Sequence, residues 1–338
     1  MSERVILAIE SSCDETAVAI TRGTTLLSNA VSSQIAMHQK YGGVMPEIAS
    51  RLHTENIVYT LDTALKTANV QLDEVDYFAV TRGPGLIGAL HVGMQAAKTL
   101  ALIYNKPLVP VHHLAAHIYA AEFVTPLKFP CLAIVVSGGN TEFVIMDQHL
   151  SFKTIGETKD DAIGECYDKV ARILDLGYPG GIPIDRLSKV GEPTYKLPSP
   201  ALCVGYDFSF SGLKTHVINL VSNAKQRGEA INVPDLCASF QKVAIDAIVE
   251  KGLKAAQDYG VKQVVIAGGV SANSYLRSEV LAKFPPLGVE AAIPPMWCCT
   301  DQAAMIAKLA SYLIDEQLFA PHSLGVDPNW EIEDFRQY

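Results

Sequence analysis

The chain opens on Val5-Ile6-Leu7-Ala8-Ile9, continues through the small polar residues Ser11-Ser12-Cys13-Asp14, and becomes apolar again at Ala17-Val18-Ala19-Ile20. An unbroken apolar run of five residues predicts a buried strand, and the polar residues after it predict a tight turn into a second strand. This stretch therefore predicts a hairpin whose polar turn stands at the end of a fully buried strand.

The same order returns in the second half of the chain. Leu132 to Val136 is apolar, Ser137-Gly138-Gly139-Asn140 is a turn sequence, and Thr141 to Ile145 is again apolar. Such internal similarity is a sign of a duplicated architecture. Each half is thus expected to begin with a strand, a tight turn and a second strand.

A second pair of segments repeats in the same way. Strands expected at 77–80 and 264–267 end in glycine loops, at 82–85 and 268–269, and a helical pattern follows each loop. The helices that periodicity predicts most clearly are 48–68, 87–104, 235–258 and 301–316.

The repeated order predicts a two-lobed α/β fold of the actin, hexokinase and Hsp70 type, with duplicated lobes around a nucleotide cleft. In such a fold the hairpin turns cradle phosphates through backbone N–H groups. The alternative is a pair of ordinary hairpins in an α/β enzyme. We expect one lobe over 1–128, packed also by a C-terminal helix at 301–318, and the other over 129–300.

Composition is that of a globular protein. Of the 338 residues, 49% are hydrophobic and 19% are charged. No apolar run has the length of a membrane span, and the first residues, Met1 to Arg4, resemble neither a signal peptide nor a transit peptide. The seven cysteines contain no C-x-x-C pair, which favours reduced thiols. A cytoplasmic protein without membrane contact is expected.

Net charge weighs against nucleic acid as a partner. The formal charge is −9, whereas lysine and arginine contacts to phosphate dominate nucleic-acid affinity. An enzyme this acidic would need a local basic patch or a partner protein that supplies one.

Two histidines suggest a metal site. His113 and His117 are four residues apart, so on a helix their imidazoles project from one face and can share an ion. Such a pair alone is more often a packed pair than a site. Leu114 stands where the metalloprotease pattern H-E-x-x-H places its general base, which counts against a peptidase of that class. A third ligand must come from elsewhere, and Asp301, expected to open a helix, is a candidate.

Acids crowd the first hairpin. Glu10, Asp14 and Glu15 either are exposed turn residues or handle a cation or protons beside the apolar strand. Farther along, Asp168 precedes the turn Tyr178-Pro179-Gly180-Gly181, and Asp185 follows it. Aspartates beside such a turn suit ribose hydroxyls.

Asn273 follows Gly268-Gly269 and is either a helix cap or a ligand contact. Capping is the default for an asparagine at this position.

These motifs together resemble the universal tRNA threonylcarbamoyladenosine transferase family, in its bacterial branch, over nearly the whole chain. The matching segments are 8–16, 41–47, 82–85, 113–117, 136–139, 160–165, 178–181, 208–214, 268–273 and 299–301. Two small departures are Asn140, where bacterial members usually have histidine, and Gln302, where asparagine is usual.

The resemblance implies a reaction and a site. It implies transfer of threonylcarbamoyl from threonylcarbamoyl-adenylate to N6 of the adenosine 3′ of the anticodon in ANN-decoding tRNAs, with release of AMP. It implies one divalent ion, iron(II) or zinc, on His113, His117 and Asp301, and acidic assistance from Asp14 and Glu15. It implies donor contacts at Val135, Val136, Ser137, Gly138, Gly139, Asp168, Gly181, Asp185 and Asn273.

The same resemblance implies partners: tRNA, a degenerate paralogue of the same fold, and a small P-loop ATPase. Such partners would account for the acidic charge of this chain. The competing interpretations are a metallopeptidase, a small-metabolite kinase of the same fold, and a non-catalytic scaffold.

Overall fold

A computed structural model describes residues 3–336, so Met1 and Ser2, with the expectation attached to them, lie outside the described residues. The chain divides into two compact units. The first runs to Ala120 and resumes at Thr300, and the second is Ala121–Cys299. Each unit contains one five-stranded mixed sheet.

The first sheet has the order β3-β2-β1-β4-β5. Strand β1 pairs antiparallel with β2 and parallel with β4, and β5 continues the parallel side. The strands are β1 (Val5–Glu10), β2 (Glu15–Arg22), β3 (Thr25–Ser33), β4 (Tyr77–Gly83) and β5 (Leu108–His112).

The second sheet repeats this arrangement. Its order is β10-β9-β6-β7-β8. If β6 to β10 are matched in turn with β1 to β5, this is the order of the first sheet written in reverse. Strand β6 pairs antiparallel with β7 and parallel with β9, as β1 pairs with β2 and β4. The strands are β6 (Cys131–Val136), β7 (Thr141–Met146), β8 (Lys153–Glu157), β9 (Gln263–Ala267) and β10 (Glu290–Ala292). The two predicted hairpins and the strands predicted at 77–80 and 264–267 are confirmed.

The third strand of each meander was not predicted. Strands β3 and β8 lie at sheet edges, and both mix exposed with half-buried residues instead of forming a buried run. An edge strand needs apolar side chains on one face only, so its apolar pattern is weak.

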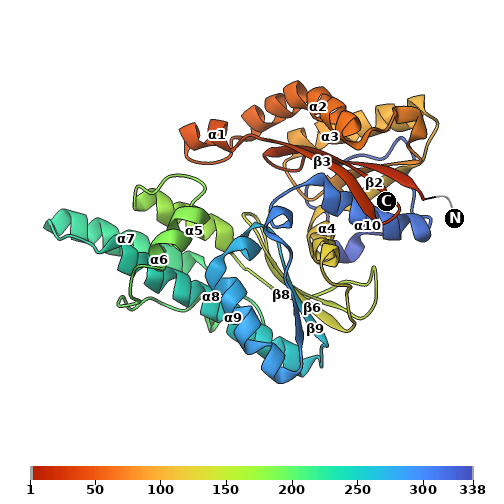
Figure 1. Ribbon diagram of the computed structural model, residues 1–338. Helices are drawn as coiled ribbons and strands as arrows, with labels where there is room; N and C mark the ends of the chain where they lie inside the picture. Colours follow the sequence, from red (N-terminus) through yellow and green to blue (C-terminus); the bar gives the residue numbers. More distant parts are fainter. Residues whose placement is uncertain (1–2, 337–338) are drawn as a thin grey trace. The chain divides into compact units, whose positions relative to one another are not determined.

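In the first unit, helices cover the sheet. Helices α2 (Pro46–Ala68) and α3 (Ile87–Ile103) pack together on it, and α10 (Ala303–Asp315) packs on β1 and β2 (Figure 1). Leu7 and Ile9 of β1 belong to the core that includes Met94 of α3. Because side chains alternate along a strand, Ile6 and Ala8 point to the opposite face. Both faces of β1 are buried, as its unbroken apolar run predicts.

Four predicted helices are confirmed with small shifts at their ends. Helix α2 begins two residues earlier than predicted because Pro46 stands in the first turn, where its missing N–H costs nothing. Helix α8 likewise begins at Val233, with the Asn232 side chain as its cap. The first unit also contains α1 (Ile35–His38) and α4 (His113–Tyr119).

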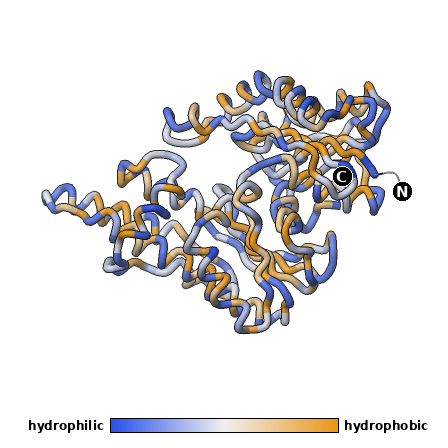
Figure 2. Tube along the Cα trace, viewed as in Figure 1, coloured by the Kyte–Doolittle hydropathy of each residue, from blue (hydrophilic) through white to orange (hydrophobic). Residues whose placement is uncertain are grey.

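In the second unit the helices pack around β6 and β9, which Figure 2 shows as apolar stretches. The helices are α5 (Ile163–Ile173), α6 (Gly181–Ser188), α7 (Ser211–Arg227), α8 (Val233–Asp258) and α9 (Ser274–Lys283). Short 3₁₀ turns occur at Gln39–Tyr41, Leu72–Glu74, Ala120–Phe123, Pro200–Leu202, Gly269–Ala272, Pro285–Leu287, Met296–Cys298 and Ile332–Asp334. Within 3–336, none of the helices combines the length and hydropathy that a bilayer span requires.

Candidate functional site

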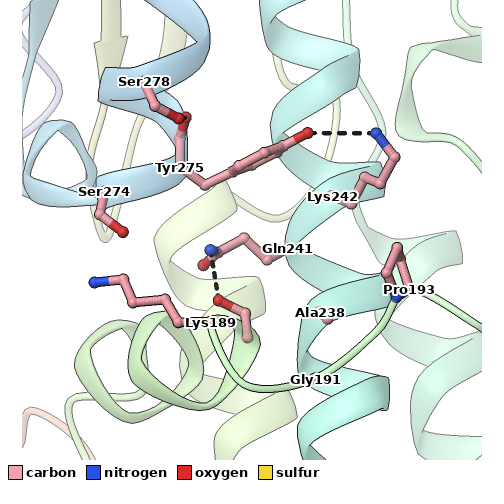
Figure 3. A pocket seen from close by; sticks show the side chains of 10 residues that line it. Lys189, Gly191, Pro193, Ala238, Gln241, Lys242, Ser274, Tyr275 and Ser278 are labelled. Carbon is pink, nitrogen blue, oxygen red and sulfur yellow. Dashed lines mark hydrogen bonds between the residues drawn. The ribbon is translucent and has the colours of Figure 1, made fainter.

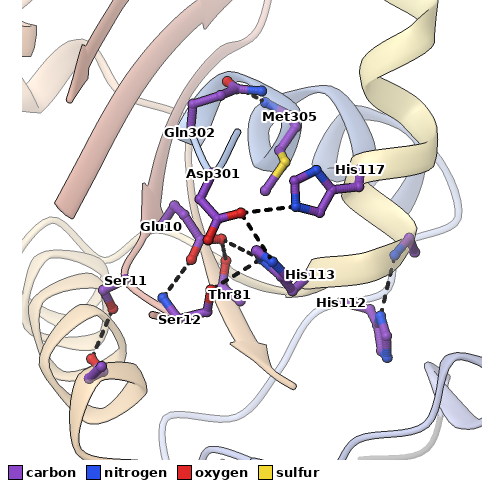
Figure 4. A network of polar contacts seen from close by, with 12 residues as sticks. Glu10, Ser11, Ser12, Thr81, His112, His113, His117, Asp301, Gln302 and Met305 are labelled. Atoms are coloured by element: carbon purple, nitrogen blue, oxygen red, sulfur yellow. Dashed lines mark hydrogen bonds and ion pairs between the residues drawn. The ribbon is translucent and has the colours of Figure 1, made fainter. Parts of the chain in front are cut away.

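The site in the first unit forms at one edge of its sheet. Strands β1 and β5 lie on the parallel side, with β4 between them, so their carboxyl ends meet at the same edge. Strand β1 ends at Glu10, and α4 begins at His113 directly after β5. His112 caps α4, with its ring accepting from the Ala115 N–H and its Nε2 bonded to the Trp330 carbonyl oxygen. It therefore faces away from the site (Figure 4).

Three predicted ligands meet at this edge. His113 and His117 lie one turn apart on α4, and Asp301 comes from the segment before α10 (Figure 4). The Asp301 Oδ1 atom is 3.0 Å from Nε2 of His117 and 3.5 Å from Nε2 of His113. One ligand atom from each residue lies within 4.8 Å of the other two. The arrangement is a possible metal site.

The chemistry of these residues fits a metal ion. Two imidazole nitrogens and one carboxylate oxygen are a donor set that suits zinc or iron. Nδ1 of His113 lies 3.0 Å from Oε2 of Glu10, and a carboxylate in that position directs the Nε2 lone pair toward an ion. The same Glu10 carboxylate accepts from the Thr81 hydroxyl and from the Ser12 N–H, so it is firmly held.

The carboxylates and imidazoles of the site shift one another's pKa values. Burial by itself lowers the pKa of His113, but the carboxylates of Glu10 and Asp301 outweigh it and raise this pKa to about 9. Burial opposes ionisation of Asp301, yet His113 and His117 lower its pKa to about 2. Burial lowers the pKa of His117. Without an ion, the site therefore holds one proton on His113 and a neutral His117.

One detail of the sequence interpretation is wrong. Asp301 does not open a helix, because α10 begins at Ala303 and its cap is Gln302, whose side chain accepts from the Met305 N–H. The Gln302 oxygen takes the capping role, so the Asp301 carboxylate is left to face the two histidines.

The acids of the first hairpin are buried, not exposed turn residues. Asp14 and Glu15 each expose 9% of their surface. Burial, together with the neighbouring Asp14, raises the pKa of Glu15 to about 10, and Glu15 accepts a hydrogen bond from Ser33. Burial also raises the pKa of the Cys13 thiol well above its usual range. At neutral pH both Glu15 and Cys13 are therefore protonated.

In the second unit, the predicted phosphate turn follows β6. Ser137 and Asn140 close it, with the Ser137 N–H bonded to the Asn140 oxygen at 2.8 Å and the Asn140 N–H to Ser137 Oγ at 3.0 Å. A Cβ added at Gly138 or Gly139 would meet nothing within 4 Å, so the backbone here is open to approach. The side chains of Val135 and Val136, by contrast, are fully buried in the sheet, so only their backbone can meet a ligand.

The predicted ribose residues lie around helix α6. Asp168 accepts from the Gly180 N–H at 2.7 Å and so holds the turn that precedes Gly181. Asp185, one turn into α6, accepts from the Ser274 hydroxyl and from the Gln241 amide. In this structure Asp168 holds the turn before α6, and Asp185 links α6 to α8 and to the start of α9.

Asn273 is the cap of α9, as expected by default, since its side chain accepts from the Leu276 N–H. Its amide also donates to Gln241 Oε1 at 2.7 Å. Gln241 thus joins Asn273 to Asp185, although nothing in its sequence context on α8 indicated this.

A pocket of about 390 Å³ adjoins this network (Figure 3). It is lined by Ser188, Lys189, Gly191, Pro193, Ala238, Gln241, Lys242, Ser274, Tyr275 and Ser278. Of the predicted donor residues, the structure thus brings Asp185 and Asn273 together at this pocket through Gln241 and Ser274. The Ser137 turn is joined instead to α5, through the Gly164 N–H.

Most of the chain matches a known protein family. Residues 25–308 match the family model described as tRNA N6-adenosine threonylcarbamoyltransferase. This chain belongs to that family.

Relatives bearing the family's name are similar end to end. The tRNA N6-adenosine threonylcarbamoyltransferase of Bacillus cereus is 54% identical over 97% of this chain and 97% of its own length. That of Halalkalibacterium halodurans is 52% identical over 99% and 98%. The resemblance stated from the motifs is therefore confirmed.

Solved structures establish the fold. Component A of the (R)-2-hydroxyglutaryl-CoA dehydratase of Acidaminococcus fermentans aligns with a TM-score of 0.54, at 15% identity, over 93% of this chain and 98% of its own. Full-length HypF, in a phosphate- and nucleotide-bound form, aligns with a TM-score of 0.61, at 15% identity, over 94% of this chain and 47% of its own. This member of the threonylcarbamoyltransferase family has the duplicated α/β fold of the actin-like ATPases, as predicted.

Proposed function

We propose that this protein transfers a threonylcarbamoyl group to N6 of an adenosine in tRNA. The relatives that match it over 97% of both chains are named for that reaction. The observation that carries the proposal in the structure is the meeting of His113, His117 and Asp301, with Glu10 behind His113.

The finer proposal concerns donor and acceptor. The donor is threonylcarbamoyl-adenylate, and the acceptor is the adenosine 3′ of the anticodon in ANN-decoding tRNAs. The N6 amine attacks the carbamoyl carbonyl, a C–N bond forms, the bond from that carbon to the phosphate oxygen breaks, and AMP leaves. The amine loses one proton, which needs a base.

Asp14 is our candidate for that base. The neighbouring Glu15, with its pKa raised to about 10 by burial and by Asp14, is already protonated at neutral pH and cannot accept the proton. Glu15 would instead keep a neutral group beside Asp14.

Metal binding is part of the proposal. His113, His117 and Asp301 would hold one iron(II) or zinc ion, which when bound polarises carbonyl or phosphoryl oxygens as a Lewis acid. Glu10 would fix the ring of His113.

Donor binding is assigned to the second unit. The turn at Ser137-Gly138-Gly139 offers an open backbone for phosphate. The pocket beside Asp185 and Asn273 would take the nucleoside, with Gln241 as an additional contact. Asp168 would act through the turn at Gly180 and Gly181.

Partners complete the proposal. A chain with a net charge of −9 is poorly suited to hold tRNA by itself. We propose that a degenerate paralogue of the same fold and a small P-loop ATPase work with it, in the cytoplasm where tRNA is found.

The test is a transfer assay with purified tRNA, synthetic threonylcarbamoyl-adenylate and the partner proteins. We expect modification of the tRNA and one AMP per group transferred. Asp301→Ala should abolish transfer and leave donor binding partly intact. Asp168→Ala should mainly weaken donor binding, by about ten- to a hundredfold for the loss of a charge-assisted hydrogen bond. Phosphorylation of a metabolite or cleavage of a peptide, with no change to tRNA, would refute the proposal.

A further inference from the structure

The turn between β1 and β2 is held by its own carbonyl groups. The Ser12 carbonyl accepts from the Leu86 N–H at 2.8 Å, and the Asp14 carbonyl accepts from the Gln34 N–H at 3.0 Å. Between them, the Cys13 carbonyl lies 3.0 Å from Nε2 of His53. Three successive carbonyls are thus bound by three separate segments, and only the middle contact comes from a side chain.

His53 is a buried histidine outside the metal site. It stands on α2 and exposes none of its surface. A carbonyl oxygen can only accept, so Nε2 carries the proton, and Nδ1 accepts from the Thr16 hydroxyl at 2.7 Å. Burial lowers the pKa of His53, which keeps the ring neutral and preserves this pattern. Thr16 therefore orients the ring, and the ring holds Cys13.

The turn carries groups on which the site depends. Ser12 donates its N–H to Glu10 and places its hydroxyl 3.2 Å from Nδ1 of His113. The backbone of Gly85 packs closely against Ser12, since a Cβ added at Gly85 would lie 2.6 Å from the Ser12 oxygen. The Asp14 carboxyl follows directly.

We infer that His53 is a positioning residue for the transfer reaction: by holding the Cys13 carbonyl, it sets the direction in which the Asp14 carboxylate is presented. In a trans peptide the C=O of Cys13 and the N–H of Asp14 lie in one plane and point in opposite directions. Fixing that plane fixes the start of the Asp14 residue, and with it the path of its side chain. This inference rests on the proposed function, because Asp14 is the base only if the transfer occurs.

Three substitutions separate the two bonds of His53. Glutamine places an amide donor near the position of Nε2 and can keep the Cys13 bond, so His53→Gln should hold kcat within about threefold. Asparagine reaches only the position of Nδ1, and leucine makes neither bond. For His53→Asn and His53→Leu, kcat should fall about ten- to a hundredfold, the scale of a 1 Å misplacement. KM for the adenylate donor should stay within about threefold of wild type in each.

A control distinguishes positioning from loss of packing. Ile57 lies one turn farther along α2 and is buried in the core of the first unit. Ile57→Ala should lower Tm at least as much as His53→Leu and yet keep kcat within about threefold. Thr16→Val should lower kcat in the wild-type background and have no further effect in His53→Leu, because the two residues act through one contact.

The outcomes are decisive. Any of three results would overturn the inference. The first is a kcat of His53→Leu equal to that of wild type. The others are equal losses of kcat in His53→Gln and His53→Asn, or in His53→Leu and Ile57→Ala. In all of these cases the wild-type protein still modifies tRNA, so the proposed function stands. If the wild-type protein transfers nothing, the proposed function fails, and hydrogen exchange at the Asp14 amide still tests the contact between His53 and Cys13. The exchange rate should rise at least tenfold in His53→Leu and stay near the wild-type rate in His53→Gln. Equal exchange rates in the two variants would overturn the inference.

Discussion

Oε2 of Glu10 lies 3.0 Å from Nδ1 of His113, across 103 residues of sequence. Glu10 is fully buried at the end of β1, and Thr81 of β4 donates to the same oxygen. Glu10 ends β1 and His113 directly follows β5, and these two parallel strands have only β4 between them, so the order of strands creates this pair. A carboxylate behind a ligating imidazole usually fixes its ring and raises its basicity.

Substitution of Glu10 should therefore weaken metal binding. We expect Glu10→Gln to lower the affinity for zinc by about 10- to 100-fold, since the ring of His113 loses its charged partner. Competition with a chromophoric chelator measures this. Glu15→Gln is the matched control, because Glu15 is already protonated at neutral pH, and it should change the affinity less than threefold. Equal losses in the two variants would contradict the role given to Glu10.

The raised pKa of His113 predicts how metal binding depends on pH. Burial opposes the proton, but Glu10 and Asp301 raise this pKa to about 9 in the metal-free protein. An ion must displace that proton, so the affinity should rise about tenfold per pH unit up to pH 9 and level off above it. Zinc titrations between pH 6 and 9 measure the slope. A flat profile would show that His113 carries no proton there.

The same pKa has a consequence for stability without metal. The folded-state pKa of about 9 is above the ordinary histidine pKa of 6.5, so the stabilisation is complete below pH 6.5 and is lost as pH rises through 9. Chelator-treated protein should therefore show a Tm that falls from pH 6.5 to pH 9. His113→Gln should remove this part of the decline, and an unchanged decline in that variant would assign it to other groups.

Substitutions at two glycines should distinguish an effect on stability from an effect on donor binding. A Cβ at Gly164 would lie 2.5 Å from the Ser137 oxygen and 2.8 Å from Cα of Gly138, so Gly164→Ala must shift the turn proposed to bind phosphate. A Cβ at Gly139 meets nothing within 4 Å. We expect Gly164→Ala to lower Tm, and Gly139→Ala to keep Tm while weakening the binding of the adenylate donor measured by calorimetry. Wild-type donor affinity in Gly139→Ala would move the phosphate elsewhere.

Asn273 caps α9 and is proposed to contact the donor as well, and substitutions can test these two roles separately. Asn273→Ala loses the cap of α9, at a cost of about 1 kcal/mol. Asn273→Asp keeps a capping oxygen and loses the N–H that donates to Gln241. Thermal unfolding should rank Asn273→Ala as less stable, whereas calorimetry should show weakened AMP binding in both. If Asn273→Asp binds AMP as wild type does, the residue only caps the helix.

Binding to tRNA should depend on partners and on salt. With a net charge of −9, the isolated chain should bind tRNA weakly, and more tightly with its partners. The affinity of the complex should fall steeply from 50 to 200 mM salt, because phosphate contacts release counterions. Tight, salt-independent binding of tRNA by the isolated chain would count against the proposed assembly.

The sequence alone determined the local elements and the family. The hairpins after β1 and β6, the long helices and the spacing of His113 and His117 could be predicted because side-chain period and turn chemistry act over a few residues. The edge strands β3 and β8 could not, since a strand exposed on one face has a weak apolar signal.

Only the tertiary structure decided which distant groups meet. Asp301 reaches His117 across 184 residues, Gln241 joins Asp185 to Asn273, and His53 holds the Cys13 carbonyl. It also showed that Asp301 precedes the cap of α10 instead of opening that helix. These contacts follow from strand order and from the way helices pack on the sheets. A hydrogen bond between segments far apart in the chain leaves no periodic trace in either segment, so it exists only once the core has placed both.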